Sequence, residues 1–458
     1  MIVAYAGLAA LLGLSAAHRA WQLARWAALR GRAPVVTAEA TAWRPRVTVQ
    51  IPTYNERDVV ARAIAAAAAL DWPRDRLEVQ VLDDSDDDTV DRAQAAVVAA
   101  RAAGVDIAHL RRSTRDGFKA GALAAGTRVA TGELIAVFDA DFVPPPDALR
   151  ALVPHLHAPG VGMAQARWGH LDVAGPLRAA QAALLDGHFR VVQHGRWASG
   201  AWLNFNGTAG VWRREAIDAG GGWSGRTLTE DLDLSYRAQL AGWRFVYVDS
   251  VVVPAELPGD WAALRAQQRR GAIGTTQVLR RLGRAILFSG APLGTRAEAL
   301  GHLASHLAWL PALALTLLLP WVLWARGAAT TPGWADVLVA LALPLASVAH
   351  YAAASPARTW GRVPLAFLVV MGLTASQAVA VLRALITEGG AFVRTPKSGE
   401  GRGSYRSVDA PWLERGMAVW TAAGLGVAVW TGAWLHVPLL ALGAVAYAWA
   451  GFSRFNGR

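Results

Sequence analysis

Long apolar segments at both ends of the chain constrain its fold most strongly, because they bracket one polar region that runs from Arg46 to about Leu282. Residues 2–17 form an uncharged apolar run at the amino-terminal end. Five later apolar runs are each close to the length that crosses a bilayer: 302–325, 334–353, 363–385, 417–435 and 437–452. The pattern predicts a multi-pass membrane protein with one sizeable polar domain.

The hydrophobic fraction of the sequence agrees with a membrane protein, and its net charge indicates which molecules the protein could bind. Of the 458 residues, 54% are hydrophobic, and the mean hydropathy is +0.27. The net charge of +11 suits nucleic acid, anionic lipid or phosphorylated substrates. The arginines are dispersed or lie beside apolar segments, which favours membrane lipids as partners, and no nucleic acid is expected. The chain has no cysteine, which excludes disulfides, thiolate zinc sites and cysteine nucleophiles.

Charges around the apolar runs predict an orientation. Residues 2–17 are followed by Arg19, Arg25 and further arginines, so 1–45 is interpreted as an uncleaved anchor with a basic flank. The loop 389–415 is also basic, which predicts that it lies inside. The polar region and this loop can lie on the same side of the membrane only if part of 363–385 lies along the interface and does not cross. The chain then has one amino-terminal span and about four carboxy-terminal spans in 284–458. We therefore expect a cytoplasmic-membrane protein whose polar domain is cytoplasmic.

The polar region alternates strand-like and helix-like segments. Strands are predicted at 47–51, 77–82 and 133–138, and an alanine-rich helix at 58–70. Strand, helix, strand in repetition implies an α/β domain with a mixed, mostly parallel sheet. The ligands of such sheets gather at the carboxyl ends of their strands, and each of these strands ends in a polar motif.

Asp139 and Asp141 follow the third of these strands with one residue between them. Two carboxylates at one turn can reach the same cation, and hard oxygen ligands without histidine or cysteine indicate Mg²⁺ or Mn²⁺. Such pairs are also common at turns and helix caps, so the motif gains its weight from its place at a strand end.

Other charged residues permit both a functional and a structural interpretation. In the acidic run 83–88, only Asp83 and Asp84 adjoin the strand and are candidates for contacting a nucleoside, whereas the others suit solvent or a helix cap. Lys119 enters a predicted helix, where it could meet a pyrophosphate. Trp168 lies in the polar region and is a candidate for stacking on a sugar, but packing in the core is the default explanation for a tryptophan there.

Glu230 and Asp231 begin a segment with helical spacing. Acidic residues at a helix amino terminus complement its dipole, which would explain either one alone. Transfer of a sugar to a hydroxyl also needs a base that accepts the hydroxyl proton. A carboxylate close to a metal-bound diphosphate would meet that need.

The motifs, in this order, resemble the membrane-embedded family 2 glycosyltransferases of the cellulose synthase-like and glucomannan synthase-like branch. The resemblance extends from Pro52 to about Lys397 and implies a GT-A domain at 46–283. It also implies a nucleotide-sugar site with a divalent metal at Asp139 and Asp141. The residues implied for nucleotide-sugar binding are Pro52, Tyr54, Glu56, Asp83, Asp84, Lys119, Asp139, Gln267 and Arg270.

The same resemblance implies roles for the catalytic and acceptor residues. Asp231 would be the base, with Glu230 beside it and Arg270 stabilising the leaving diphosphate. Phe205, Asn206 and Gly207, with Trp168, would contact the acceptor, and 177–197 would be an interfacial helix. Phe392, Thr395 and Lys397 would belong to a gating loop that closes over the nucleotide-sugar.

One position departs from the family pattern Gln-x-x-Arg-Trp, because Gln267-Gln268-Arg269-Arg270 is followed by Gly271. In processive relatives that tryptophan stacks on the terminal sugar of the acceptor, so the change puts polymerisation and the kind of acceptor in question.

The sequence leads us to expect an inverting hexosyltransferase that uses UDP-glucose or GDP-mannose. The favoured acceptor is a growing β-linked polysaccharide, with export of the chain possible. The alternative is addition of one or a few sugars to a membrane lipid. A scaffold or nucleotide-binding regulator fits less well, because metal, base and leaving-group motifs are all present.

Overall fold

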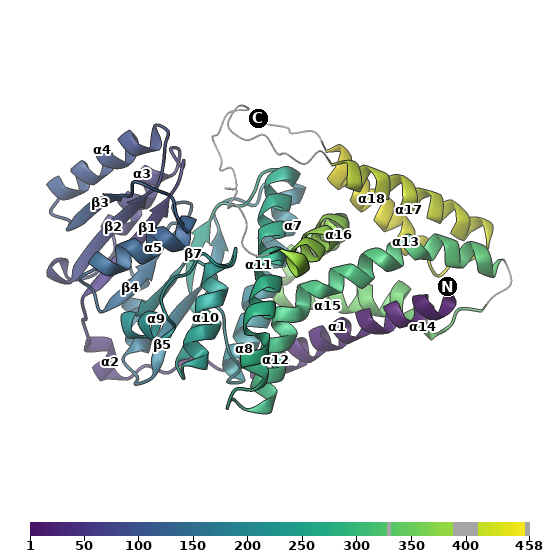
Figure 1. Cartoon of the computed structure of the whole chain (residues 1–458), viewed down its shortest axis with the longest axis horizontal. Coiled ribbons are helices and arrows are strands. Elements are labelled where there is room, and N and C mark those ends of the chain that lie inside the picture. Colours follow the sequence, from purple (N-terminus) through teal and green to yellow (C-terminus); the bar gives the residue numbers. More distant parts are fainter. Residues whose placement is uncertain (328–330, 388–410, 454–458) are drawn as a thin grey trace.

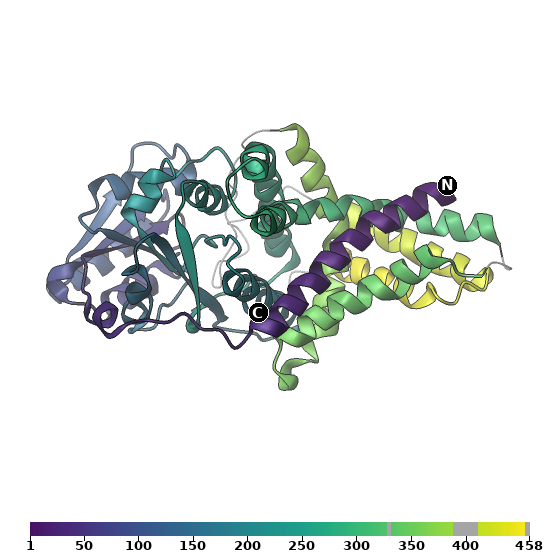
Figure 2. The same ribbon diagram turned by 90° about the horizontal axis from the view of Figure 1, so that it is seen from below.

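The computed structural model describes residues 1–327, 331–387 and 411–453. It has a sheet-containing domain at one end and a bundle of long helices at the other (Figures 1 and 2). The first helix, α1 (Ile2–Leu29), belongs to the bundle, and its amino-terminal end lies at the tip farthest from the sheet. The polar domain therefore follows one long bundle helix and precedes the others, as the apolar runs predict.

Seven strands form one mixed sheet in the order β3-β2-β1-β4-β6-β5-β7. Their bounds are β1 Val47–Thr53, β2 Leu77–Asp83, β3 Ile107–Arg111, β4 Leu134–Val137, β5 Val161–His170, β6 Gly210–Arg213 and β7 Arg244–Ala255. Strands β1 to β4 are parallel to one another, whereas β6 runs antiparallel to both β4 and β5. The predicted fold class, a mixed and mostly parallel α/β sheet joined to a helical bundle, is confirmed.

The two faces of the sheet carry the core of the domain. β1, β2 and β4 are buried along their whole length, as expected of strands covered on both faces. The helices of this domain are α2 Ala38–Ala42, α3 Val60–Ala68, α4 Thr89–Ala102, α5 Phe118–Val129, α6 Ala148–Leu152, α7 Pro176–Asp186, α8 His194–Ala198, α9 Arg214–Ala219, α10 Glu230–Leu240 and α11 Trp261–Leu287. A π-helical stretch, Gly187–Gln193, joins α7 to α8, so the predicted interfacial helix at 177–197 is one continuous helical segment.

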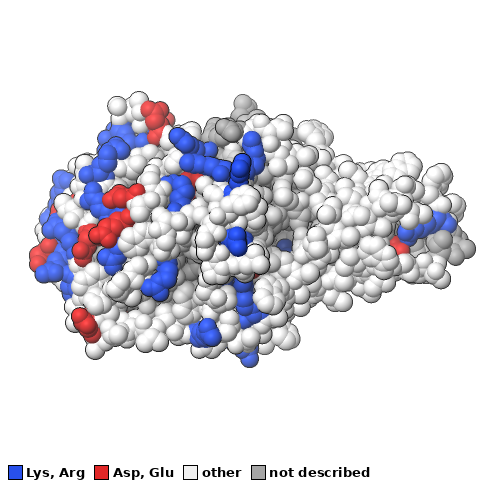
Figure 3. Space-filling model, turned by 60° about the horizontal axis from the view of Figure 1, so that its bottom comes forward, with Lys and Arg blue, Asp and Glu red and all other residues white. Residues whose placement is uncertain are grey.

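The carboxy-terminal helices complete the bundle. They are α12 Leu293–Ala304, α13 Trp309–Arg326, α14 Trp334–Val337, α15 Leu343–Ala354, α16 Arg362–Ile386, α17 Trp412–Trp430 and α18 Val437–Phe452. Charged side chains cover the sheet-containing end of the molecule, and most of the bundle surface in the same view lacks them (Figure 3). A surface of this kind suits hydrocarbon.

Four helical segments in the described ranges are long and apolar enough to cross a membrane: Ile2–Leu29, Leu293–Arg326, Trp334–Ala354 and Arg362–Ile386. The helix α18 is apolar but shorter. Among the four, Arg362–Ile386 is the most buried inside the protein. It packs on α7 and α11 of the sheet-containing domain and on α18. Its predicted position along the interface, and the number of spans, stay predictions.

Candidate active site

The candidate site lies where the loops after parallel strands meet. β1 pairs with β2 on one side and with β4 on the other, all in parallel, so their carboxyl ends share one edge of the sheet. Tyr54 follows β1, Asp84 follows β2, and Asp139 follows β4. Topology alone therefore gathers three of the motifs recognised in the sequence.

Asp139 and Asp141 occupy a tight turn after β4. The backbone N–H of Asp139 donates to Thr208 Oγ1 at 2.9 Å, and the N–H of Phe142 donates to the Asp139 carbonyl at 2.9 Å. Asp141 is buried, whereas Asp139 is partly exposed. The turn is thus fixed to the loop that carries Gly207 and Thr208.

Lys119 joins the acidic groups of the site. Its Nζ lies 2.6 Å from Asp139 Oδ1 and 3.9 Å from Glu230 Oε1, and it donates to the Gly207 carbonyl at 2.9 Å. Burial opposes its charge, but Asp139 and Glu230 outweigh that effect and raise the pKa of Lys119. It is therefore a permanent cation in contact with three separate segments of the chain.

Asp231 lies at the amino terminus of α10, close against Gly207. A methyl group added at Gly207 would lie 3.2 Å from Asp231 Oδ2, and Gly207 has φ of +84°. Burial, followed by the neighbouring Glu230 carboxylate, raises the pKa of Asp231 to about 7. Burial also raises the pKa of Glu230. A carboxyl group with a pKa near neutrality suits a base that must accept a proton at physiological pH.

The long helix α11 holds this acidic segment in place. Any Cβ at Gly274 would lie within 2.8 Å of three atoms of Thr229, so the helix backbone packs directly on the residue before Glu230. One and two turns further on, Gln277 Oε1 accepts from Leu228 N at 3.0 Å and Arg281 pairs with Asp233 at 3.2 Å. Arg270 lies one turn before Gly274 on the same helix face. Its charge lowers the pKa of Glu230 in opposition to burial.

The loop at 204–208 forms the other wall of the site. Asn206 Oδ1 accepts hydrogen bonds from Asn204 Nδ2 at 3.0 Å and from His188 Nε2 at 2.9 Å. Burial lowers the pKa of His188 to about 4, so the imidazole is neutral and its Nε2 carries the proton that it donates. The amide group of Asn206 is therefore fixed next to Gly207 and Asp231.

The two aromatic residues predicted to contact the acceptor, Phe205 and Trp168, both pack against other aromatic side chains of the domain. Phe205 is fully buried, with its ring centroid 5.6 Å from that of Trp212. Trp168 packs edge-on against Phe142 at 5.0 Å and lies 5.2 Å from Phe189. Phe142 follows Asp141 directly, so Trp168 supports the acidic turn. For Trp168, packing explains the observed contacts.

Two arginines that the sequence did not distinguish from surface charges contact Tyr54 and Asp84, which are predicted to bind the nucleotide. Arg112 donates two hydrogen bonds to the carboxylate of Asp84, and the Nε–Oδ1 distance is 2.9 Å. The guanidinium carbon of Arg115 lies 3.2 Å from the centroid of the Tyr54 ring. No local motif marks these arginines, because their importance depends on the pairing of β2 with β3 and on the path of the next loop.

The remaining predicted nucleotide contacts differ in their surroundings. Asp83 is buried at the end of β2, where it accepts from Ser85 N and pairs with His109 Nε2, both at 2.9 Å. These hydrogen bonds outweigh burial and lower the pKa of Asp83. Pro52 is buried within β1, and Glu56 begins the turn into α3. Asp83 thus braces the loop after β2, and Asp84 lies nearer the candidate site.

Gln267 is half-buried on α11, one turn before Gly271. Within the described parts of the chain, no heavy atom outside the helix's own local backbone lies within 4 Å of a Cβ placed at Gly271. Packing among these residues therefore does not require glycine at this position. The predicted gating-loop residues Phe392, Thr395 and Lys397 lie outside the described residues.

The chemistry of the acidic turn suits a divalent metal shared with a substrate. Among the described residues, no group of three or more His, Cys, Asp or Glu side chains could hold a metal by itself. Mg²⁺ and related ions usually bind through one or two carboxylates, with substrate phosphates and water completing the shell. Asp139 and Asp141 provide such a pair, and Lys119 adds a cation next to it. The residues present fit this mode of binding.

A parallel sheet with an acidic turn after β4, an antiparallel β6 and a second acidic pair opening α10 defines the GT-A class of glycosyltransferase fold. The chain belongs to the family described as glycosyltransferase like family 2, which matches residues 45–274. The matched range includes the Asp139 turn, the Asp231 segment and Arg270, and so covers the whole described site.

Curated relatives and a solved structure agree with this assignment. A probable glucomannan 4-beta-mannosyltransferase 7 of Oryza sativa subsp. japonica is 45% identical over 251 residues, which are 54% of this chain and 43% of the relative. A glucomannan 4-beta-mannosyltransferase 2 of Arabidopsis thaliana is 44% identical over 245 residues, 52% of this chain and 46% of the relative. The chain spans about half the length of the curated relatives it matches.

Among solved structures, a mannosyltransferase from Pyrobaculum calidifontis, PcManGT, in complex with GDP-Man and Mn²⁺, has the same fold. It is 24% identical with a TM-score of 0.61, and the alignment covers 83% of this chain and 99% of that one. The likeness includes most of the helical bundle as well as the sheet, because the alignment exceeds the length of the sheet-containing domain.

Proposed function

We propose that this protein is an inverting glycosyltransferase that moves a hexose from a nucleotide-diphosphate sugar to a growing β-linked polysaccharide at a membrane. The observation that carries the proposal is the position of Asp231. Its half-buried carboxyl group, whose pKa is raised to about 7, lies against Gly207, between the acceptor-side loop and the Lys119–Asp139 pair.

Each of these residues has a separate role in the displacement of the nucleoside diphosphate from the anomeric carbon. Asp231 accepts the proton of the acceptor hydroxyl while the hydroxyl oxygen attacks the anomeric carbon. The bond from that carbon to the diphosphate breaks, so the configuration inverts and the nucleoside diphosphate departs. Lys119 and Arg270 balance the charge that builds on the diphosphate. A divalent ion at Asp139 and Asp141 would supply further positive charge to the same phosphates.

The donor we favour is GDP-mannose, with UDP-glucose as the other candidate. The curated relatives that share 44–45% identity with this chain are named as glucomannan mannosyltransferases. Tyr54, Asp84 and Lys119, which would bind the nucleotide, lie within residues 45–274, the range that matches the family. The nucleobase would lie towards Tyr54 and Arg115, and the diphosphate towards Lys119 and the Asp139 turn.

We further propose that the bundle spans the cytoplasmic membrane with the catalytic domain on the cytoplasmic side, where nucleotide-sugars are made. The basic flank of α1 supports this orientation. Export of the finished chain is part of the same proposal. Accessibility of single introduced cysteines is a direct test, because the chain has none of its own.

The reaction is testable with purified protein in lipid nanodiscs. Radiolabelled GDP-mannose and UDP-glucose are supplied separately, with and without Mn²⁺, and a β-mannan oligosaccharide is the acceptor. We expect sugar transfer from one of the two donors. The rate of transfer should fall about 10²- to 10⁴-fold in Asp231→Asn. Asp218→Asn, which changes an exposed carboxylate in α9, is the matched control. Full activity in Asp231→Asn would overturn the assignment of the base.

A second candidate is addition of one or a few sugars to a membrane lipid. Gly271 favours it, because this position of α11 has no aromatic side chain on which the end of a polymer could stack. The same assay separates the two, since a lipid product enters organic solvent and stays short, whereas a polysaccharide remains in the aqueous phase and lengthens with time.

A further inference from the structure

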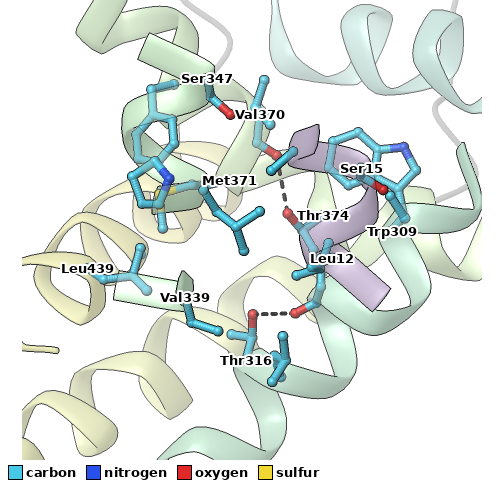
Figure 4. A pocket seen from close by; sticks show the side chains of 18 of the residues that line it. Leu12, Ser15, Trp309, Thr316, Val339, Ser347, Val370, Met371, Thr374 and Leu439 are labelled. Atoms are coloured by element: carbon cyan, nitrogen blue, oxygen red, sulfur yellow. Dashed lines mark hydrogen bonds between the residues drawn. The ribbon is translucent and has the colours of Figure 1, made fainter. Parts of the chain in front are cut away.

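The helical bundle contains a partly open cavity of about 310 Å³, and none of its lining residues belongs to the candidate active site. Its volume lies at the lower end of the range for small-molecule sites. Helices α1, α13, α15, α16, α17 and α18 all contribute to its wall. In Figure 4 the labelled side chains of α1, including Leu12 and Ser15, approach those of α13, including Thr316.

The cavity is long in the direction of the helices. On α1 its wall runs from Leu12 through Ser15 to Arg19, which are spaced three and four residues apart on one face. On α13 and the preceding turn it runs from Ser305 to Leu319. Fourteen residues of helix rise by about 21 Å. A space of this shape suits a chain-like ligand better than a compact one.

The middle of the cavity offers a ligand hydrocarbon contacts. Leu315, Leu319 and Leu440 are among the lining residues. The hydroxyls of Thr316, Thr374 and Thr421 donate to carbonyls of their own helices, at 2.8, 3.2 and 2.7 Å (two of these bonds are drawn in Figure 4). They are satisfied locally. A polysaccharide, whose hydroxyls need partners along its length, would be poorly accommodated there.

One end of the cavity is polar and basic. Arg19, Ser305, His306 and Ser347 line it. Arg19 Nη1 donates to Ser347 Oγ at 3.4 Å and to Tyr351 OH at 3.5 Å, and no carboxylate in the described parts of the chain forms an ion pair with it. Arg19 lies towards the end of α1 that adjoins the catalytic domain (Figure 2). Arg19 follows the apolar run 2–17, so its guanidinium can reach the lipid head groups at the end of that run.

We propose that this cavity is a binding site for an anionic membrane phospholipid, whose phosphate meets Arg19 and one of whose acyl chains lies among Leu12, Leu315 and Leu440. The polarity of the wall matches that of the lipid, with a cation at the domain end and hydrocarbon beyond it. The lipid would bridge α1 to the carboxy-terminal helices without taking part in sugar transfer. The site is independent of the proposed reaction and of its donor.

The test uses the full chain in nanodiscs of phosphatidylcholine with a trace of phosphatidylglycerol that carries a photoactivatable group in its acyl chain. We expect cross-links within the α1 and α13 peptides that line the cavity. Unlabelled phosphatidylglycerol should displace the probe at about fivefold lower concentration than added phosphatidylcholine. In Arg19→Gln that preference should disappear while the apolar wall still binds.

A pair of phenylalanine substitutions distinguishes the cavity from the outer surface. Ala346 lines the cavity from α15, so Ala346→Phe should fill it and reduce labelling about tenfold. Ala422 is exposed on α17 and does not line the cavity, so Ala422→Phe should label like the unchanged protein. Thermal unfolding of both variants checks their folding. Unchanged labelling in a folded Ala346→Phe, or cross-links spread evenly over the outer faces of the bundle, would overturn the proposal.

Discussion

Lys119 Nζ and Asp139 Oδ1 lie 2.6 Å apart and join the first turn of α5 to the acidic turn after β4. The same ammonium group donates to the Gly207 carbonyl and faces Glu230. One side chain therefore connects the acidic turn after β4, the loop at 204–208 and the amino terminus of α10. Its partners come from three separate parts of the sequence.

Replacing Lys119 with methionine should lower kcat/KM for the nucleotide-sugar about 10²- to 10³-fold, because the diphosphate loses a fixed positive charge. Most of the loss is expected in the step that breaks the bond to the diphosphate. The apparent affinity for the divalent metal should change in the same variant, because Asp139 loses its cationic partner. Arg128→Met, at the exposed end of α5, is the control. Equal kinetics in the two variants would contradict a role for Lys119 in the site.

The pH dependence of transfer should report the ionisation of Asp231. Burial raises the pKa of this carboxyl to about 7, and only the carboxylate form can accept a proton. Below pH 7 the protonated form predominates, so kcat/KM should fall about tenfold for each pH unit. Above pH 8 this group should no longer limit the rate. Initial rates between pH 5.5 and 8.5, at saturating metal, test the prediction, and a flat profile across this range would be incompatible with it.

Much of this architecture follows from local sequence. The strands β1, β2 and β4 and the helices α3, α5 and α10 lie close to where their patterns predict them. Buried parallel strands are recognisable in the sequence as short apolar runs, and each of these runs ends in a polar motif. Because parallel strands share an edge, Asp84 and Asp139 could be assigned to one site before their contacts were known.

Other features depend on tertiary contacts that no short motif encodes. The two hydrogen bonds from Arg112 to Asp84 depend on the pairing of β2 with β3, and the stacking of Arg115 on Tyr54 depends on a loop path. The burial of Phe205 depends on the antiparallel β6, which the sequence did not predict. Phe205 therefore lies in the core of the domain, although it belongs to the segment that resembles the acceptor-side loop.

Gly207→Ala should impair transfer more than it impairs folding. Alanine at φ of +84° costs about 1–2 kcal/mol, and its methyl group would lie 3.2 Å from Asp231 Oδ2. Gly104→Ala is a matched control, because it has φ of +80° and no heavy atom within 4 Å of the added methyl group. We expect similar losses in thermal stability for both variants and a drop in kcat of more than about tenfold for Gly207→Ala alone.

Two glycines on α11 should respond oppositely to alanine. At Gly274 the methyl group would meet Thr229 Cγ2 at 2.4 Å and its backbone N at 2.8 Å, so α11 must move away from α10. We expect a loss of about 1–3 kcal/mol in unfolding free energy and reduced activity. At Gly271 none of the residues that the structure describes lies within 4 Å of the methyl group, and alanine should stabilise the helix by up to about 1 kcal/mol. Chemical denaturation of both variants measures the difference in unfolding free energy. Equal changes in the two variants would mean that the close packing of α11 on Thr229 does not contribute to stability.

Gly271→Trp tests whether the aromatic side chain of the family pattern would bind the acceptor here. Among the described residues no heavy atom lies within 4 Å of the Cβ position, so the indole can leave the helix there and offer a face to the acceptor. Stacking of a sugar on an aromatic face contributes about 1 kcal/mol, which corresponds to about a fivefold lower KM for an oligosaccharide acceptor. Products should also lengthen, because the end of the chain dissociates more slowly between transfers. Gly271→Leu adds bulk without an aromatic face and is the control. If both variants shorten the products equally, the space accommodates the acceptor itself and the aromatic platform is not what the site lacks.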